Sequence, residues 1–154
     1  MQDKTTLSDI AFRPATADDF DYCAGLYFAG MDTAIRRLNL DRAAQTASFH
    51  RQWAPAEVRI ITRHGVSIGW LQAAALPDAL FLKQLFVEGL SQRQGVGTAV
   101  MHSLIAEAAD TGRPMTLGVV KTNPARRLYE RLGFRVTNED ERKFYMRREG
   151  SPKP

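Results

Sequence analysis

The sequence is poor in cysteine and has no long apolar run. Cys23 is the single cysteine among 154 residues, which excludes an internal disulfide and any metal site built from several cysteines. No segment approaches the roughly 20 consecutive apolar residues of a membrane-spanning helix. The first residues, M-Q-D-K-T-T, carry no apolar signal core. We therefore expect a cytoplasmic protein with no membrane partner.

Histidine is also scarce. The three histidines, His50, His64 and His102, stand far apart in the sequence, and none has further ligand-type residues at the spacing of a metal site. We therefore expect no bound metal.

Charge is balanced in one part of the chain and positive in the other. Residues 1–90 carry 9 Lys and Arg against 10 Asp and Glu, whereas residues 91–154 carry 12 against 7. A basic segment indicates an anionic partner. Nucleic acid, a phosphorylated cofactor and an ordinary solvated surface all agree with this charge.

Length and composition predict one domain. A chain of 154 residues, 44% of them hydrophobic, is large enough for one core and too short for two independent ones. We expect a single domain over residues 1–154, with frayed ends at 1–9 and 149–154.

Hydrophobic periodicity and turn residues predict alternating strands and helices. Thr16 and Asp19 have the spacing of a capping box, which opens a helix carrying Phe20, Cys23 and Tyr27 on one face. Asn123 is expected to cap a short helix that has Pro124 in its first turn and ends at Gly133. The other helices are predicted over 42–53 and 98–110, and strands over 10–13, 58–62, 66–71, 80–87, 115–120, 134–137 and 143–146. The strand at 80–87 reads as central and buried on both faces, with a parallel crossover to the strand at 115–120.

The most informative segment is a glycine loop between this strand and the helix at 98–110. It reads Q-R-Q-G-V-G-T over residues 92–98. Glycines separated by one residue let the main chain turn tightly, and the main-chain N–H groups at a helix start bind phosphate without a particular side chain. The loop lacks the lysine of a P-loop and the third glycine of a dinucleotide fingerprint.

Two motifs together resemble the GNAT acetyltransferase superfamily. Gln92, Gly95 and Gly97 match the family pattern [RQ]-x-x-G-x-[GA], and N-P-A-R-R-L-Y-E-R-L-G-F at residues 123–134 is similar to its second conserved block. The resemblance spans roughly residues 10–146 and is sharp over 80–134. It implies an α/β fold with a mixed, mostly antiparallel sheet of six to seven strands, flanked by about four helices and splayed between strands 4 and 5.

The resemblance also implies a site for acetyl-coenzyme A. The pyrophosphate is expected at the main-chain N–H groups of residues 94–98, and the amides of the pantetheine arm at the edge of residues 85–87. A main-chain amide near Phe86 is expected to stabilise the oxyanion. The cofactor-binding residues are then Leu85, Phe86, Val87, Gln92, Arg93, Gln94, Gly95, Val96, Gly97, Thr98, Asn123 and Arg126.

Tyr129 is the expected catalytic residue. The family places a tyrosine on this short helix, and its phenol can give a proton to the departing thiolate. Taken outside the motif, Tyr129 reads as a core residue packed beside Leu128 and Leu132.

No general base is identified. Leu80 and Phe81 stand where family members often have a glutamate, and Glu88 and Asp78 flank the strand as alternatives or as surface carboxylates. Within the strand, Lys83 and Gln84 are polar and can face the substrate. The aromatic residues Tyr22, Tyr27 and Phe28 fall on the first helix, where the family builds its acceptor pocket.

These observations predict an N-acetyltransferase that moves an acetyl group from acetyl-coenzyme A to a primary amine of a small molecule or peptide, by direct attack in a ternary complex. A non-catalytic acyl-coenzyme A sensor of the same fold is the alternative, because the strand carboxylate is missing. A nucleic-acid-binding module is disfavoured, since no nucleic-acid motif accompanies the arginines. The acceptor stays unidentified, and a monomer and a homodimer are both compatible with the sequence.

Overall fold

The computed structural model describes residues 9–92 and 94–150. These residues form two compact units. The first comprises the chain up to Gln72 together with Gln84–Val96, and the second comprises Ala73–Lys83 and the chain from Gly97 onward. The expectation of a single domain stays a prediction.

Seven strands of the described residues form one sheet in the order β1-β2-β3-β4-β5-β7-β6. The pair β4–β5 is parallel, and the pairs β1–β2, β2–β3, β5–β7 and β6–β7 are antiparallel. The β4–β5 register covers residues Leu80–Leu82 and Met115–Leu117, in the first part of each strand. The mixed sheet and the four α-helices of the described residues confirm the predicted fold class. The strands are β1 (Ile10–Pro14), β2 (Val58–Arg63), β3 (Val66–Leu76), β4 (Ala79–Val87), β5 (Met115–Val120), β6 (Arg135–Glu139) and β7 (Lys143–Arg148).

The helices follow the predicted order along the chain. No helix of the described part of the chain is both long and apolar enough to cross a bilayer. The α-helices are α2 (Phe20–Arg37), α3 (Arg42–Gln52), α4 (Val96–Asp110) and α5 (Ala125–Arg131), and the 3₁₀ turns are η1 (Ala17–Asp19), η2 (Pro55–Glu57) and η3 (Gly89–Ser91).

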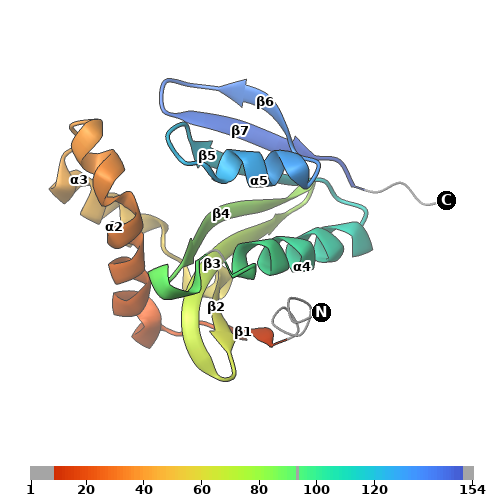
Figure 1. Ribbon diagram of the computed structural model, residues 1–154, viewed down its shortest axis with the longest axis horizontal. Coiled ribbons are helices and arrows are strands. Elements are labelled where there is room, and N and C mark those ends of the chain that lie inside the picture. Colours follow the sequence, from red (N-terminus) through yellow and green to blue (C-terminus); the bar gives the residue numbers. More distant parts are fainter. Residues whose placement is uncertain (1–8, 93, 151–154) are drawn as a thin grey trace. The chain divides into compact units, whose positions relative to one another are not determined.

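In the first unit, α2 and α3 lie on one side of β1 to β3 (Figure 1). The predicted capping box is confirmed: Asp18 N–H donates to Thr16 Oγ1 at 3.3 Å, and Thr16 N–H donates to Asp19 Oδ2 at 2.9 Å. The box closes η1, which leads directly into α2. Helix α2 buries Cys23 and Tyr27, four residues apart on one face. The core around them consists of Cys23, Tyr27, Phe49, Val58, Ile60 and Trp70.

The β2–β3 connection is the predicted tight turn. Both His64 (φ 53°) and Gly65 (φ 80°) adopt left-handed backbone, as a two-residue hairpin turn requires. His64 is exposed and lies 3.1 Å from Asp9.

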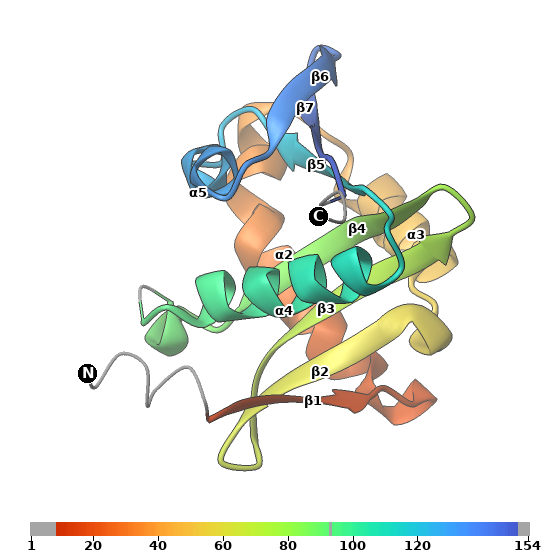
Figure 2. The ribbon, with the colours of Figure 1, turned by 90° about the vertical axis from the view of Figure 1, so that its right-hand side faces the viewer.

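In the second unit, α5 lies beside β5 and β7 (Figures 1 and 2). Strand β5 alternates buried and half-buried residues, with Met115, Leu117 and Val119 inward. Hydrophobic spacing predicts an apolar stripe on helix α4, formed by Val100, Met101, Leu104, Ile105 and Ala108. The structure buries four of these residues and leaves Ile105 half-buried. His102, which lies off the stripe, is exposed.

Several sequence expectations need correction, among them the end of β3, which is at Leu76 and not at residue 71. Helix α4 begins at Val96, two residues before the predicted start, so Gly97 and Thr98 lie in its first turn. Helix α5 begins at Ala125 with Pro124 in the cap position, one residue later than expected. Strand β4 is buried in its first part, but Lys83 is exposed and the residues from Gln84 to Val87 are half-buried, because a strand with a polar pair cannot bury both faces along its length.

Candidate functional site

The glycine loop joins the end of β4 to the start of α4 within the first unit. After Val87 the chain makes the 3₁₀ turn η3 and reaches Gly95. Gly95 has φ +82°, a left-handed conformation that costs an L-residue with a side chain about 1–2 kcal/mol. The backbone therefore favours glycine at Gly95, and helix α4 starts at the next residue.

Two glutamine side chains form hydrogen bonds with main-chain carbonyls of this segment. Gln92 Nε2 donates to the carbonyl of Val87 at 2.9 Å, and Gln94 Nε2 donates to the carbonyl of Leu90 at 2.9 Å. Gln94 Oε1 in turn accepts from Arg63 at the end of β2, at 2.6 Å. The sequence assigned Gln92 and Gln94 to the cofactor, and the structure gives their side chains a role in holding the loop.

The main-chain N–H groups of the loop suit an anion. Among the described residues of the first unit, no carbonyl accepts a hydrogen bond from the N–H groups of Gln94, Gly95 or Val96. Val96 as a whole is buried, with 1% of its surface exposed, and it is the first residue of α4. Such N–H groups carry the positive end of the helix dipole. Arg93, expected to add a charge-assisted contact, lies outside the described residues.

The second part of β4 is fixed by its neighbours in the first unit. The ring of Phe86 stacks on Trp70 at 5.5 Å and meets Tyr27 edge-on at 5.6 Å. A Cβ on Gly69 of β3 would lie 2.3 Å from the Phe86 carbonyl oxygen, so glycine is needed for this close approach. Leu85, Phe86 and Val87 are half-buried. Their side chains would not need to face the cofactor, because the expected contact with the pantetheine arm is made by the main chain.

The remaining assigned residues belong to the second unit. Gly97 and Thr98 lie in α4, and Asn123 precedes α5. Asn123 Oδ1 accepts from Ala125 N–H at 2.8 Å, so the capping interaction exists although Pro124 holds the cap position. Arg126 is already engaged: its guanidinium lies over the Phe144 ring at 4.3 Å and pairs with Glu130 at 3.1 Å.

Tyr129 is a buried residue of α5. It is 8% exposed and packs against Phe134 with ring centroids 6.0 Å apart. Burial raises its pKa to about 12. The phenol therefore keeps its proton at neutral pH. A general acid and a buried core tyrosine both meet this condition, so it does not separate the two roles.

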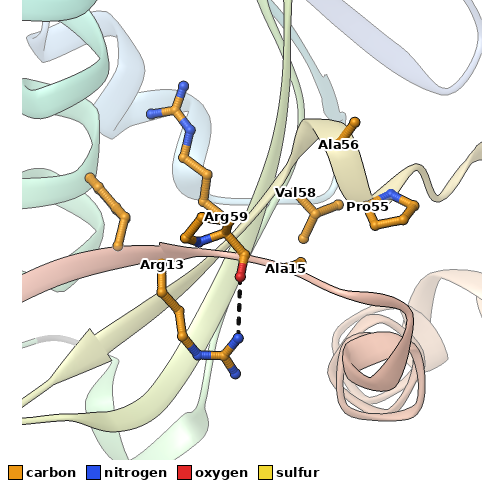
Figure 3. Close-up of a pocket in the computed structure, with 8 residues that line it drawn as sticks. Arg13, Ala15, Pro55, Ala56, Val58 and Arg59 are labelled. Carbon is orange, nitrogen blue, oxygen red and sulfur yellow. Dashed lines mark hydrogen bonds between the residues drawn. The ribbon is translucent and has the colours of Figure 1, made fainter.

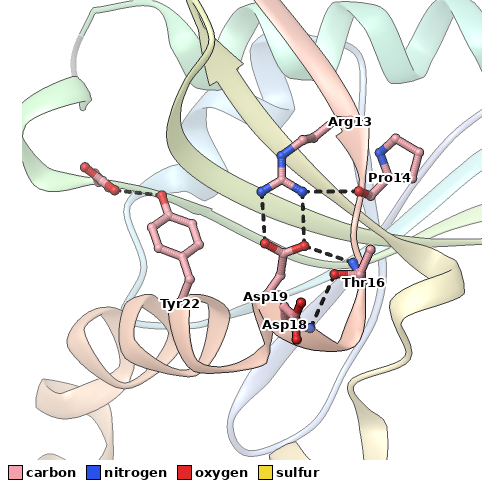
Figure 4. Close-up of polar contacts among 7 residues, drawn as sticks. Arg13, Pro14, Thr16, Asp18, Asp19 and Tyr22 are labelled. Atoms are coloured by element: carbon pink, nitrogen blue, oxygen red, sulfur yellow. Dashed lines mark hydrogen bonds and ion pairs between the residues drawn. The ribbon is translucent and has the colours of Figure 1, made fainter.

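The carboxylates considered as bases have different surroundings. Asp78 is exposed, whereas Glu88 is half-buried and accepts a hydrogen bond from the Tyr22 hydroxyl at 2.6 Å (Figure 4). Leu80, at the approximate family position of the glutamate, is buried. The pairing of Tyr22 with Glu88 was missed by sequence reasoning, because 66 residues separate the two and neither belongs to a motif.

A cavity of about 360 Å³ lies elsewhere in the first unit (Figure 3). The side chains of Arg13 and Arg59 extend from it in opposite directions (Figure 3), and Arg13 is held by Asp19 at 2.9 and 3.1 Å. None of the residues assigned to the cofactor lines this cavity. Its lining consists of Phe12, Arg13, Pro14, Ala15, Pro55, Ala56, Val58 and Arg59.

The family of the chain follows from its similarity to a known domain. The model of the acetyltransferase (GNAT) domain matches residues 41–146, which is more than half of the chain. The chain belongs to the GNAT acetyltransferase family. The match includes the glycine loop, α4 and α5, and it leaves β1 and α2 outside.

Solved structures show the same GNAT fold. Ard1 from Thermoplasma volcanium has a TM-score of 0.67 at 18% identity, over 94% of this chain and 99% of its own. The PaiA N-acetyltransferase from Thermoplasma acidophilum, in complex with coenzyme A, has a TM-score of 0.65 at 15% identity, over 91% and 98%. The ribosomal-protein-S18-alanine N-acetyltransferase from Escherichia coli has a TM-score of 0.56 at 23% identity, over 75% and 93%. No curated protein matches the chain in sequence.

Proposed function

We propose that this GNAT acetyltransferase transfers an acetyl group from acetyl-coenzyme A to a primary amine of a small molecule or peptide. Acetyl-coenzyme A is the co-substrate typical of the family. The observation that carries the proposal is the loop at Gly95, whose left-handed glycine leads straight into the first turn of α4. A helix start of this kind presents main-chain N–H groups that have no partner within the helix, which suits a pyrophosphate.

The reaction is direct attack in a ternary complex. The nitrogen of the neutral amine bonds to the thioester carbonyl carbon, the carbon–sulfur bond breaks, and the amine loses one proton while the departing thiolate takes one up. Holding both reactants in line supplies much of the rate. The main chain of Phe86, fixed by Gly69 and the stacked Trp70, is suited to donate to the oxyanion.

In this scheme Tyr129 is the general acid. Its raised pKa, about 12, keeps the proton on the phenol at neutral pH, so that the phenol can donate a hydrogen bond or a proton to the thiolate as the carbon–sulfur bond breaks. We also assign Gly97, Thr98, Asn123 and Arg126 to cofactor binding. Arg93 adds charge to the same loop.

Release of thiol from acetyl-coenzyme A tests the proposal. The protein is incubated with acetyl-coenzyme A and a panel of polyamines, aminoglycosides and peptides with unblocked N-termini. Turnover with at least one amine, with mass spectrometry showing an added acetyl group, is the expected result. Binding of coenzyme A without turnover on any amine would instead favour a non-catalytic acyl-coenzyme A sensor, which the buried Leu80 at the family's carboxylate position supports.

A further inference from the structure

A single hydrogen bond ties α2 to the residue that follows β4. The Tyr22 hydroxyl donates to Glu88 Oε2 at 2.6 Å, and both residues are half-buried (Figure 4). Burial and the hydrogen bond to Glu88 raise the pKa of Tyr22, so the phenol remains the donor. Hydrogen bonds of this length to a charged acceptor are among the strong ones in proteins.

Glu88 is also the main-chain anchor of the glycine loop. Its N–H donates to the carbonyl of Ile68 at 2.8 Å, which keeps it in register with β3. Its carbonyl accepts from the N–H groups of Ser91 at 2.9 Å and Gln92 at 3.1 Å. The orientation of Glu88 therefore sets the path of residues 89–92, which lead to Gly95.

We infer that Tyr22 and Glu88 are positioning residues for the cofactor loop: the phenol fixes the carboxylate, and the carboxylate fixes the main chain from which the loop starts. This inference rests on the proposed binding of coenzyme A at the loop. Neither residue needs to touch the cofactor, because both act through the carbonyl of Glu88 and the two N–H groups that it holds.

A base role for Glu88 is the competing interpretation and predicts a different result. A general base requires the carboxylate charge, and a positioning residue requires a hydrogen-bond acceptor of the same shape. Glutamine keeps an oxygen at the place of Oε2 and removes the charge. The variants Glu88→Ala and Glu88→Gln therefore separate the two roles.

The test measures coenzyme A binding by calorimetry and acetyl transfer by kinetics. Tyr22→Phe and Glu88→Ala are expected to raise the Kd for coenzyme A, and the KM for acetyl-coenzyme A, about three- to tenfold, with kcat within about twofold of the parent. Glu88→Gln should recover most of the affinity lost in Glu88→Ala. Tyr145→Phe is the matched control, since Tyr145 donates a similar hydrogen bond to Asp140 at 2.7 Å within the second unit.

Hydrogen–deuterium exchange gives a readout that needs no ligand. The amides of Ser91 and Gln92 should exchange several-fold faster in Tyr22→Phe than in the parent, while the core strand β2 keeps its protection. A protein that was only globally weakened would exchange faster throughout. Because this measurement is made on Tyr22→Phe, it tests the inference even if Glu88→Ala does not fold.

Three results would overturn the inference. Parent-like Kd and parent-like exchange in Tyr22→Phe would show that the hydrogen bond does not set the loop. A Glu88→Gln variant that binds coenzyme A normally but loses kcat together with the rising limb of its pH–rate profile would make Glu88 the base. If the parent itself fails to bind coenzyme A, the proposed function fails first and the inference falls with it.

Discussion

The carbonyl oxygen of Phe86 occupies the place where a side chain on Gly69 would begin. A Cβ built on Gly69 lies 2.3 Å from that oxygen and 3.1 Å from the Cα of Val87. The two main chains approach each other here more closely than any other residue type would allow, at the part of β4 that the cofactor arm is expected to pair with.

Substituting Gly69 by alanine is therefore expected to force β3 and β4 apart. We expect a loss of about 1–3 kcal/mol in the free energy of unfolding, the usual range for overpacking, measured by urea denaturation. Gly25→Ala is the control, since a Cβ there meets nothing within 4 Å and alanine in a helix is favoured by up to about 1 kcal/mol. Equal stability of the two variants would contradict the observed approach.

Gly95→Ala tests the left-handed turn of the loop. With φ +82°, alanine at this position should cost about 1 kcal/mol of stability and weaken coenzyme A binding at least tenfold, because the N–H groups no longer converge. Gly112→Ala is the matched variant: Gly112 also has positive φ, +69°, and open space around it, but it follows the end of α4. It should lose similar stability and keep the parent's Kd in calorimetry.

Tyr129→Phe separates catalysis from binding. Loss of the proton donor should lower kcat about 10- to 100-fold, while the Kd for coenzyme A changes less than twofold. Steady-state kinetics and calorimetry on the same preparation provide both values. A variant with full kcat would make Tyr129 a core residue alone.

Alkaline pH should destabilise the protein through Tyr129. Because burial raises its pKa to about 12, from an ordinary value near 10, the folded state holds this proton more tightly than the unfolded state does. The resulting stability is fully present below pH 10 and is lost as the pH rises through 12. Urea denaturation should show a steeper loss for the parent than for Tyr129→Phe in this window, and parallel curves would refute the assignment. The other tyrosines cancel in this comparison.

Local patterns were sufficient to predict most elements. Periodicity predicts the strand β5 and the apolar stripe of α4 between Val100 and Ala108, and both elements are observed. The spacing of hydrogen-bonding residues predicts the capping box at Thr16, which is also observed. The predicted starts of α4 and α5 differ from the observed starts by one or two residues. Gly97, which reads as a loop residue beside Gly95, accepts helical backbone in the first turn of α4.

Contacts between residues that lie far apart in the sequence were beyond sequence reasoning. The Tyr22–Glu88 pair and the stacking of Arg126 on Phe144 join residues that no local pattern connects. The side chains of Gln92 and Gln94 donate hydrogen bonds to main-chain carbonyls of the loop. The sequence could not predict this, because the amide of a glutamine can bind a ligand or the main chain equally well. The acceptor escapes prediction for a related reason: α2, which carries Tyr22, Tyr27 and Phe28, precedes the segment shared with the family model.

The burial of Cys23 has a practical consequence for enzymology. Its side chain is fully enclosed, and burial raises the pKa of the thiol to about 11, so in the native protein it stays protonated and out of reach of chromogenic disulfide reagents. Colour developed during a continuous assay then reports released coenzyme A alone, without a background from the enzyme. The same reagent added in denaturant titrates one sulfhydryl per chain, which makes this residue an intrinsic reporter of opening.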